Sequence, residues 1–453
     1  MSADPYAMLR TRRYVVLLVF AAVLGVPIAA AAYYFLWLIN HLQTWVFSDL
    51  PDGLGFDGEP TWWPAVPLLV AGLIVGATIR YLPGRGGHSP ADGFEAGAPP
   101  APVELPSILL AALASLGLGA VVGPEAPLIA LGGGIAALVV RLLKRDAPAQ
   151  TLAVVAGAGS FAAIAALLGS PLLGAFLLME AIGLGGAAAT MVLLPGLLAA
   201  GIGALVFIGI GTASGVGTFS LAVPNLPPFS HPSASEFAWA LAIGVAAAVV
   251  GTAIHRLAVY LRPPVERRIV LLAPVAGLVI ALLAIGYAEA TSKSTADVLF
   301  SGETALPRLI NQHASYTVGA LVMLIVCKGL AYGISLSSFR GGPTFPAMYI
   351  GAAGGIALSH LPGLSLIPAI AMGIGAMTVV LLRLPLTSVL LATLLLGSDG
   401  LGTMPVVIVA VVVAFVISSW FVPHPALAPE PPETTNDTTA DPAGATSDST
   451  TLA

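Results

Sequence analysis

The chain has 453 residues, of which 57% are hydrophobic and only 9% charged, and its formal net charge is −5. Soluble domains carry about 25% charged residues, so this composition excludes a soluble enzyme and a nucleic-acid-binding protein. It indicates an all-α polytopic membrane protein. The 51 glycines and 37 prolines favour closely packed and interrupted helices.

Apolar runs long enough for helices follow one another along the chain. We expect them at 14–42, 62–82, 105–122, 125–143, 150–168, 170–182, 187–210, 235–260, 268–288, 315–336, 344–358, 365–382, 385–397 and 403–421. Several are shorter than the ~20 residues that cross a bilayer, and Pro or Gly marks their joins. Half-spanning helices that meet inside the protein are therefore predicted, as in ion pathways.

The basic residues indicate an orientation. Twelve of the 17 lie in four clusters, which begin at Arg10, Arg80, Arg141 and Arg256, whereas segments 49–60 and 211–234 contain no base. Lys and Arg collect on the cytoplasmic side of membrane proteins. The clusters and the N-terminus are therefore predicted to be cytoplasmic, and the base-free segments external.

The chain also repeats weakly. Segments 158–174 and 372–388 match in hydropathy and in the placement of one Gly and one Pro each. Two halves with one plan suggest inverted repeats around a midplane site, although low-complexity sequence can also match itself. We expect five parts: a cytoplasmic N-terminus (1–13), a first membrane repeat (14–210), an external linker (211–234), a second membrane repeat (235–424) and a disordered acidic tail (425–453).

Glu125 is the leading candidate for function. It lies in GPEAP (123–127) between long apolar runs, and a carboxylate at membrane depth is costly enough to indicate a role. Pro127 suits the first turn of a helix, which places Glu125 at a helix N-terminus, where backbone N–H groups favour an anion. A carboxylate there can leave when a mobile anion competes or when it is protonated, so it can act as a gate. The alternative is a helix-capping acid.

The order of motifs resembles that of the CLC chloride channels and chloride/proton exchangers over about residues 14–421. GPEAP (123–127) is similar to their G-x-E-G-P motif, and GGHSP (86–90) stands where they have G-S-G-I-P. SPLLGAFLLME (170–180) resembles A-P-L-x-G-x-x-F-x-x-E, with LPLTSVLLATLLL (384–396) as its second-half counterpart. GGPTFP (341–346) resembles G-G-x-F-x-P.

The resemblance implies two inverted repeats of tilted and half-spanning helices around a midplane anion site. It assigns Glu125 as the gating glutamate of a pore for chloride or a similar small anion. The implied anion-binding residues lie in three loops: Gly86, Gly87, His88, Ser89, Pro90, Gly123, Ala126, Gly341, Gly342, Thr344 and Phe345. It also implies that the protein is a homodimer in the lipid bilayer of the plasma membrane. The resemblance is to the prokaryotic type of the family, which has no cytoplasmic regulatory domains.

Several residues depart from the family pattern. Gly87 holds the place of the usual ion-coordinating serine, and Ser89 lies two residues later. Thr344 holds the place of the usual Phe, with Phe345 next, and no pore-lining tyrosine follows at the C-terminus. Ala181 stands where exchangers carry an internal glutamate, which leaves Glu180 as a candidate for the proton path or as a structural residue.

These departures leave the mechanism open between an anion channel and a chloride/proton antiporter with an atypical proton path. They also leave open another anion, such as fluoride or nitrate. No cofactor or metal is expected, because the seven histidines are scattered and the one cysteine is Cys327. A hydrolase based on GTASGVG (211–217) and His255 is not favoured, since no oxyanion partner is evident.

Overall fold

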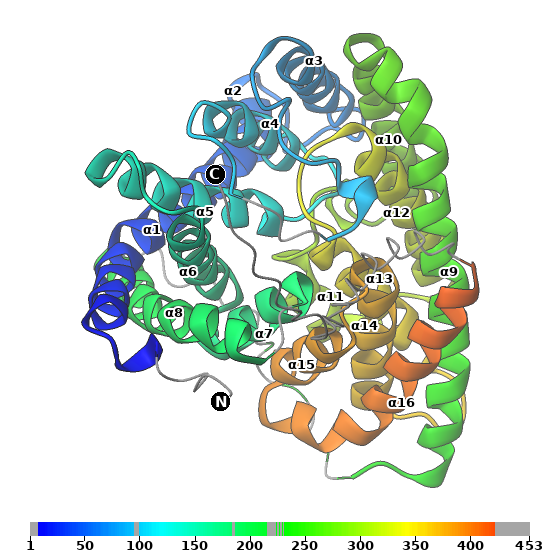
Figure 1. Ribbon diagram of the computed structural model, residues 1–453. Coiled ribbons are helices and arrows are strands. Elements are labelled where there is room, and N and C mark those ends of the chain that lie inside the picture. Colours follow the sequence, from blue (N-terminus) through cyan, green and yellow to red (C-terminus); the bar gives the residue numbers. More distant parts are fainter. Residues whose placement is uncertain are drawn as a thin grey trace, which may run out of the picture.

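The computed structural model describes residues 8–94, 99–183, 186–214 and 231–421, together with residues 223, 226 and 229. Over these residues the chain is a bundle of helices (Figure 1), which confirms the predicted all-α class. Eight of the described helices are long and apolar enough to cross a membrane, and six shorter apolar helices lie among them. The predicted tail (425–453) and part of the predicted linker (211–234) lie outside the described residues.

The first half of the chain begins with a long helix and ends with another. In chain order it contains a 3-10 turn η1 (Met8–Arg10), α1 (Arg12–Thr44), a π turn η2 (Trp45–Asp49), α2 (Leu50–Gly53), α3 (Ala65–Tyr81), a 3-10 turn η3 (Pro90–Asp92), α4 (Leu105–Gly117), α5 (Glu125–Leu143), α6 (Ala149–Leu168), α7 (Pro171–Ile182) and α8 (Gly186–Ser214).

The second half also begins and ends with a long helix. It contains α9 (Ala234–Arg267), α10 (Ile269–Thr291), 3-10 turn η4 (Thr295–Asp297), α11 (Ala305–Asn311), 3-10 turn η5 (His313–Ser315), α12 (Val318–Ser338), α13 (Thr344–Leu358), α14 (Leu366–Leu382), α15 (Pro385–Leu395) and α16 (Gly397–Phe421). In Figure 1, α1, α6 and α8 lie on the left, and α9, α14 and α16 on the right.

Glycine pairs bring the central helices of each half into close contact. A Cβ on Gly132 of α5 would lie 2.3 Å from the Gly159 carbonyl oxygen of α6. In the second half, a Cβ on Gly351 of α13 would lie 2.2 Å from the Gly373 carbonyl oxygen of α14. Only glycine lets two helices approach this closely. Gly159 and Gly373 are the two glycines that the sequence repeat aligned, so the repeat has a structural counterpart.

Prolines start the short helices that the sequence predicted. α7 begins at Pro171 and α15 begins at Pro385, positions where the missing N–H of proline costs nothing. Contacts between α7 and α15, and between α3 and α10, join the two halves. The short helices α7 and α15 therefore contact each other across the two halves.

Several boundaries differ from the prediction: α9 continues to Arg267 rather than 260, and α16 begins at Gly397 rather than 403. α4 ends at Gly117 rather than near residue 122, because residues 118–124 form a loop that pairs with the second half of the chain. The seven-residue helix α11 was not predicted, since it is too short to show a hydrophobic period.

Candidate functional site

The site is built where α5 and α13 begin. Glu125 is the first residue of α5, Pro124 precedes it as the N-cap, and Pro127 lies in the first turn. In the other half, Thr344 is the first residue of α13 and Pro343 precedes it. The first N–H groups of a helix have no partner within the helix. Two sets of such donors therefore lie at this place.

A short antiparallel bridge joins the loops that lead into the two helices. The Gly123 N–H donates to the Gly342 carbonyl oxygen at 2.7 Å, and the Gly342 N–H donates to the Gly123 carbonyl oxygen at 2.6 Å. The neighbouring Val121 N–H donates to the Ser335 hydroxyl of α12 at 3.0 Å. On the other side, the Tyr332 hydroxyl donates to the Pro343 carbonyl oxygen at 2.5 Å. Both loops are thus fixed against the opposite half.

The Glu125 carboxylate lies in this junction and is 1% exposed. Its Oε1 atom accepts a hydrogen bond from the Thr344 N–H, so it occupies the N-terminus of α13. Its Oε2 atom and the Thr344 hydroxyl are buried without a hydrogen-bond partner. A carboxylate at a helix N-terminus takes the place of an anion. The carboxylate is therefore buried at the point where the first N–H groups of α13 lie.

Two glycines make the room for this carboxylate. A Cβ on Gly123 would lie 2.0 Å from Glu125 Oε2, and a Cβ on Gly342 would lie 2.2 Å from its Cδ. No side chain fits at either position without moving the carboxylate. The GPEAP and GGPTFP motifs, 219 residues apart, therefore form one structure.

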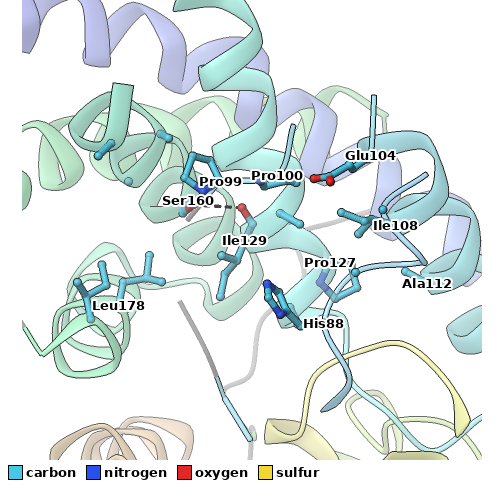
Figure 2. Close-up of a pocket in the computed structure, with 18 of the residues that line it drawn as sticks. His88, Pro99, Pro100, Glu104, Ile108, Ala112, Pro127, Ile129, Ser160 and Leu178 are labelled. Atoms are coloured by element: carbon cyan, nitrogen blue, oxygen red, sulfur yellow. Dashed lines mark hydrogen bonds between the residues drawn. The ribbon is translucent and has the colours of Figure 1, made fainter. Parts of the chain in front are cut away.

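A large cavity of about 1010 Å³ opens on one side of Glu125. Its lining comes from the loop 84–88, the first turns of α5, one side of α6, and the Arg340–Gly341 segment. Figure 2 shows the lining, with His88 near Pro127 and Ile129 of α5. Five of the residues predicted for anion binding line this cavity: Gly86, Gly87, His88, Ala126 and Gly341.

A small cavity of about 20 Å³, room for one water molecule, lies on the other side. Pro124 lines it together with Gln43, Ser301 and Glu303. Because Pro124 lines the small cavity and Ala126 lines the large one, Glu125 stands at the boundary between them. The buried carboxylate and the Gly123–Gly342 bridge lie between the residues that line the two cavities.

The remaining predicted residues lie away from the cavity lining. Ser89 is buried and its hydroxyl has no hydrogen-bond partner, and Pro90 begins the 3-10 turn η3. Phe345 is 1% exposed and packs in the core beside Thr344. In the first loop, the Gly87 N–H already donates to the Gly84 carbonyl oxygen at 2.8 Å. The Gly87 N–H is therefore already used within the loop and is not free to bind an anion.

Glu180 also meets the N-terminus of a helix in the opposite half. It lies near the end of α7 and accepts hydrogen bonds from the Leu386 N–H at 2.8 Å, the Thr387 N–H at 2.7 Å and the Thr387 hydroxyl at 2.6 Å. These are the contacts of a capping residue for α15. Both carboxylate oxygens are satisfied, in contrast to those of Glu125.

Two buried cations near the site differ in their partners. The Lys328 ammonium donates to the carbonyl oxygens of Asp297, Val298, Leu299 and Phe300 at 3.0–3.3 Å. It therefore fixes the turn that leads to Glu303. Arg340 lines the large cavity next to Gly341. Both residues lie close to the GGPTFP motif in the sequence, but only Arg340 lines the large cavity.

A family model described as "Voltage gated chloride channel" matches residues 95–419. The chain belongs to this family. The match covers the Glu125 motif and the paired GGPTFP motif, and the family is one of transporters and channels rather than enzymes. The chain is accordingly a multi-pass membrane protein of the CLC type.

Individual proteins agree with this assignment. A relative from Escherichia fergusonii, named "Putative ion-transport protein YfeO", is 26% identical over 362 residues, which are 78% of this chain and 81% of that protein. The fold is similar to the crystal structure of a slow cyanobacterial Cl⁻/H⁺ antiporter, with a TM-score of 0.71, 20% identity and coverage of 89% of this chain and 96% of that one. It is also similar to a CLC-type fluoride/proton antiporter, with a TM-score of 0.66, 20% identity and coverage of 90% and 96%.

Proposed function

We propose that this protein moves chloride, or a similar small monovalent anion, along a pathway that Glu125 closes. The single observation that carries the proposal is the position of its carboxylate. It occupies the N-terminus of α13 between a large and a small cavity, with one oxygen bonded and the other without a partner. A permeating anion competes for the same N–H donor, and protonation of the carboxyl removes its charge.

The proposed pathway is suited to releasing the anion as well as to binding it. Backbone N–H groups at helix N-termini attract an anion through partial charges, and such sites hold it weakly enough for it to leave. The cavity on the Ala126 side supplies a wide approach, and the barrier is confined to the junction of α5 and α13. We infer that the anion passes between these two helix starts when the Glu125 side chain moves away.

The test is anion efflux from proteoliposomes that contain purified protein, compared with Glu125→Gln and Glu125→Ala. A charged hydrogen bond is stronger than a neutral one by about 1–1.5 kcal/mol, so the Gln variant is expected to give roughly tenfold faster efflux. Its efflux is also expected to lose its dependence on pH. Glu289→Gln is the control, because Glu289 is an exposed acid near the end of α10.

If both Glu125 variants give the same efflux rate as the wild type, Glu125 does not act as the gate. An absence of efflux in the wild type would contradict transport itself. The two results separate the role of one side chain from the function of the whole protein.

A second candidate is proton-coupled exchange. The observation that favours it is the fold, which is similar to those of a Cl⁻/H⁺ antiporter and a fluoride/proton antiporter. Glu180 is then the proposed second proton-carrying residue, because position 181, where exchangers carry a glutamate, is an alanine. A chloride gradient imposed on proteoliposomes should drive protons against their own gradient if exchange occurs. Anion movement without proton movement would establish a channel.

We further propose that the N-terminus is cytoplasmic, that the protein lies in the plasma membrane and that it forms a homodimer. The clusters of basic residues and the family support this arrangement. Asp57→Cys and Asp146→Cys in a Cys327→Ser background test the orientation, since both aspartates are exposed. An impermeant maleimide added to intact cells should label position 57 alone, and labelling of position 146 alone would reverse the orientation.

A further inference from the structure

Arg340 is a buried cation with unused hydrogen-bonding capacity. Its side chain lines the large cavity and is 6% exposed as a residue. The Nη1 atom donates to the Phe339 carbonyl oxygen at 3.1 Å, and the backbone N–H donates to the Ser115 hydroxyl at 3.1 Å. The buried Nε–H has no acceptor. A guanidinium has five N–H donors, so the protein leaves this one under-satisfied.

No carboxylate neutralises Arg340 within the described part of the chain. The acids that act on it from a distance are Asp92 and Glu266. Arg262 pairs directly with both of them, including a 2.7 Å contact with Glu266. A buried charge without a partner is costly. This cost indicates that something other than a protein side chain balances the charge.

Lys328 shows how the same protein satisfies a buried cation that has a structural role. Four backbone carbonyl oxygens surround its ammonium at 3.0–3.3 Å, and its ring contact with Tyr349 is 4.5 Å from the ring centre. It does not line the large cavity. Arg340 has the opposite features: few protein acceptors and a position on the cavity wall.

Other anion-attracting groups line the cavity beside Arg340. A Cβ on Gly86 would lie 3.4 Å from the Arg340 Cγ, so the arginine packs against the first loop. That loop offers no side-chain hydroxyl at Gly86 or Gly87. Gly341 follows Arg340 directly, and Ala126 contributes the first turn of α5. The guanidinium thus supplies side-chain donors where the glycines supply none.

We propose that the Arg340 guanidinium binds a small monovalent inorganic anion in the large cavity, before the anion reaches the junction that Glu125 closes. The proposal deepens the transport function above and rests on it. A guanidinium is permanently charged and more weakly hydrated than an ammonium. It attracts the anion by charge, while the Gly341 and Ala126 backbone provides the next donors toward α5 and α13.

The experiment measures chloride binding to the purified full-length protein by calorimetry, together with the chloride dependence of efflux from proteoliposomes. Arg340→Gln is expected to raise the chloride Kd and the half-saturating chloride concentration about tenfold, because a charged donor is lost. Arg340→Lys keeps the charge and is expected to bind within about threefold of the wild type. Arg268→Gln is the control, since Arg268 is exposed at the junction of α9 and α10.

An unchanged Kd in a folded Arg340→Gln variant would overturn the proposal, while Glu125-dependent efflux would leave the transport function standing. Conversely, loss of chloride binding in that variant would support the binding site. An absence of efflux from the wild type in the same experiment would contradict transport without affecting that result. If Arg340→Gln does not fold, Arg340→Lys decides. A folded Lys variant with tenfold weaker binding would show that the positive charge alone does not hold the anion, and would overturn the proposal as an electrostatic site.

Discussion

Glu125 and Glu180 both extend from the first half of the chain to the N-terminus of a helix in the second half. Glu180 accepts three hydrogen bonds at 2.6–2.8 Å from the start of α15, and its residue is partly exposed. Glu125 is 1% exposed, accepts from Thr344 through one oxygen and leaves the other without a partner. The two carboxylates share a place at a helix start, but they differ in burial and in whether both oxygens have a well-aligned donor.

The difference shows what distinguishes a movable carboxylate from a fixed one. A satisfied carboxylate stabilises a helix start, and moving it costs several hydrogen bonds at once. A fully buried carboxylate with one oxygen that has no well-aligned donor carries a desolvation cost that a partly exposed, capped carboxylate does not. We therefore expect substitutions at the two sites to act on different properties: transport at Glu125 and stability at Glu180.

The largest expected effect comes from Gly342→Ala. The new Cβ would lie 2.2 Å from the Glu125 Cδ and 2.5 Å from its Oε1, so the flexible side chain of Glu125 must leave the α13 N-terminus. Efflux should rise roughly tenfold, as for loss of the charged hydrogen bond, and its pH dependence should weaken. Efflux from proteoliposomes is the measurement.

Gly354→Ala is the control for this variant, because Gly354 lies in α13, the helix that Gly342 precedes, and the nearest neighbour of its new Cβ would be 4.0 Å away. It should leave efflux unchanged. Slow, pH-dependent efflux in a folded Gly342→Ala protein would mean that the carboxylate position does not control transport.

Glu180→Ala should lower stability by about 1–2 kcal/mol, the usual cost of losing a helix cap. The change should appear as a thermal melting temperature a few degrees lower in detergent. Glu125→Gln should melt at or above the wild-type temperature, since it removes a buried charge with an unpaired oxygen. The reverse order of melting temperatures would contradict the comparison.

Glu180→Gln separates a capping role from a proton-carrying one. The variant retains one acceptor for the α15 N–H groups but cannot carry a proton as the acid does. If the wild type couples chloride to protons, loss of proton movement with retained chloride movement would assign the proton path to Glu180. Equal coupling in both proteins would leave it as a cap.

A smaller effect is expected at Glu303, which lines the small cavity outside the membrane-spanning helices. Desolvation, and then the negative charge of Glu125, raise the pKa of its carboxyl to about 8. The group is therefore neutral below pH 8 and negative above it, and the added charge repels anions. Efflux should fall roughly threefold as pH rises through about 8, which corresponds to about 0.7 kcal/mol of repulsion between the new charge and the anion.

Glu303→Gln should remove this alkaline decline. Glu59→Gln is the control, because the Glu59 carboxylate accepts from the Thr295 hydroxyl and burial raises its pKa to about 7. A decline that persists in Glu303→Gln, or disappears in Glu59→Gln, would remove Glu303 from the pathway.

Much of this arrangement could be predicted from the sequence because its signals are local. Apolar length located most of the helices, and proline located the starts of α7 and α15. Glu125 was placed at a helix start by Pro127 and by its apolar surroundings. These features depend on neighbouring residues, which a sequence displays directly.

The contacts between distant segments could not be predicted in the same way. Nothing near Gly123 indicates its bridge to Gly342, and nothing near Glu180 indicates the start of α15. Arg340 was visible beside the second motif, but its missing acceptor depends on how Phe339, Ser115 and the cavity surround it. Whether a charge is satisfied is a property of the folded structure.

The Gly123–Gly342 bridge also limits which motions can accompany transport. Two short backbone hydrogen bonds join the halves directly beside the carboxylate, so separating the halves would break them and expose buried backbone groups. Rotation of one side chain breaks neither bond. Side-chain rotations are among the fastest protein motions, whereas domain movements take microseconds to milliseconds. With Glu125 as the proposed gate, the passage opens and closes by side-chain rotation while the backbone scaffold stays still.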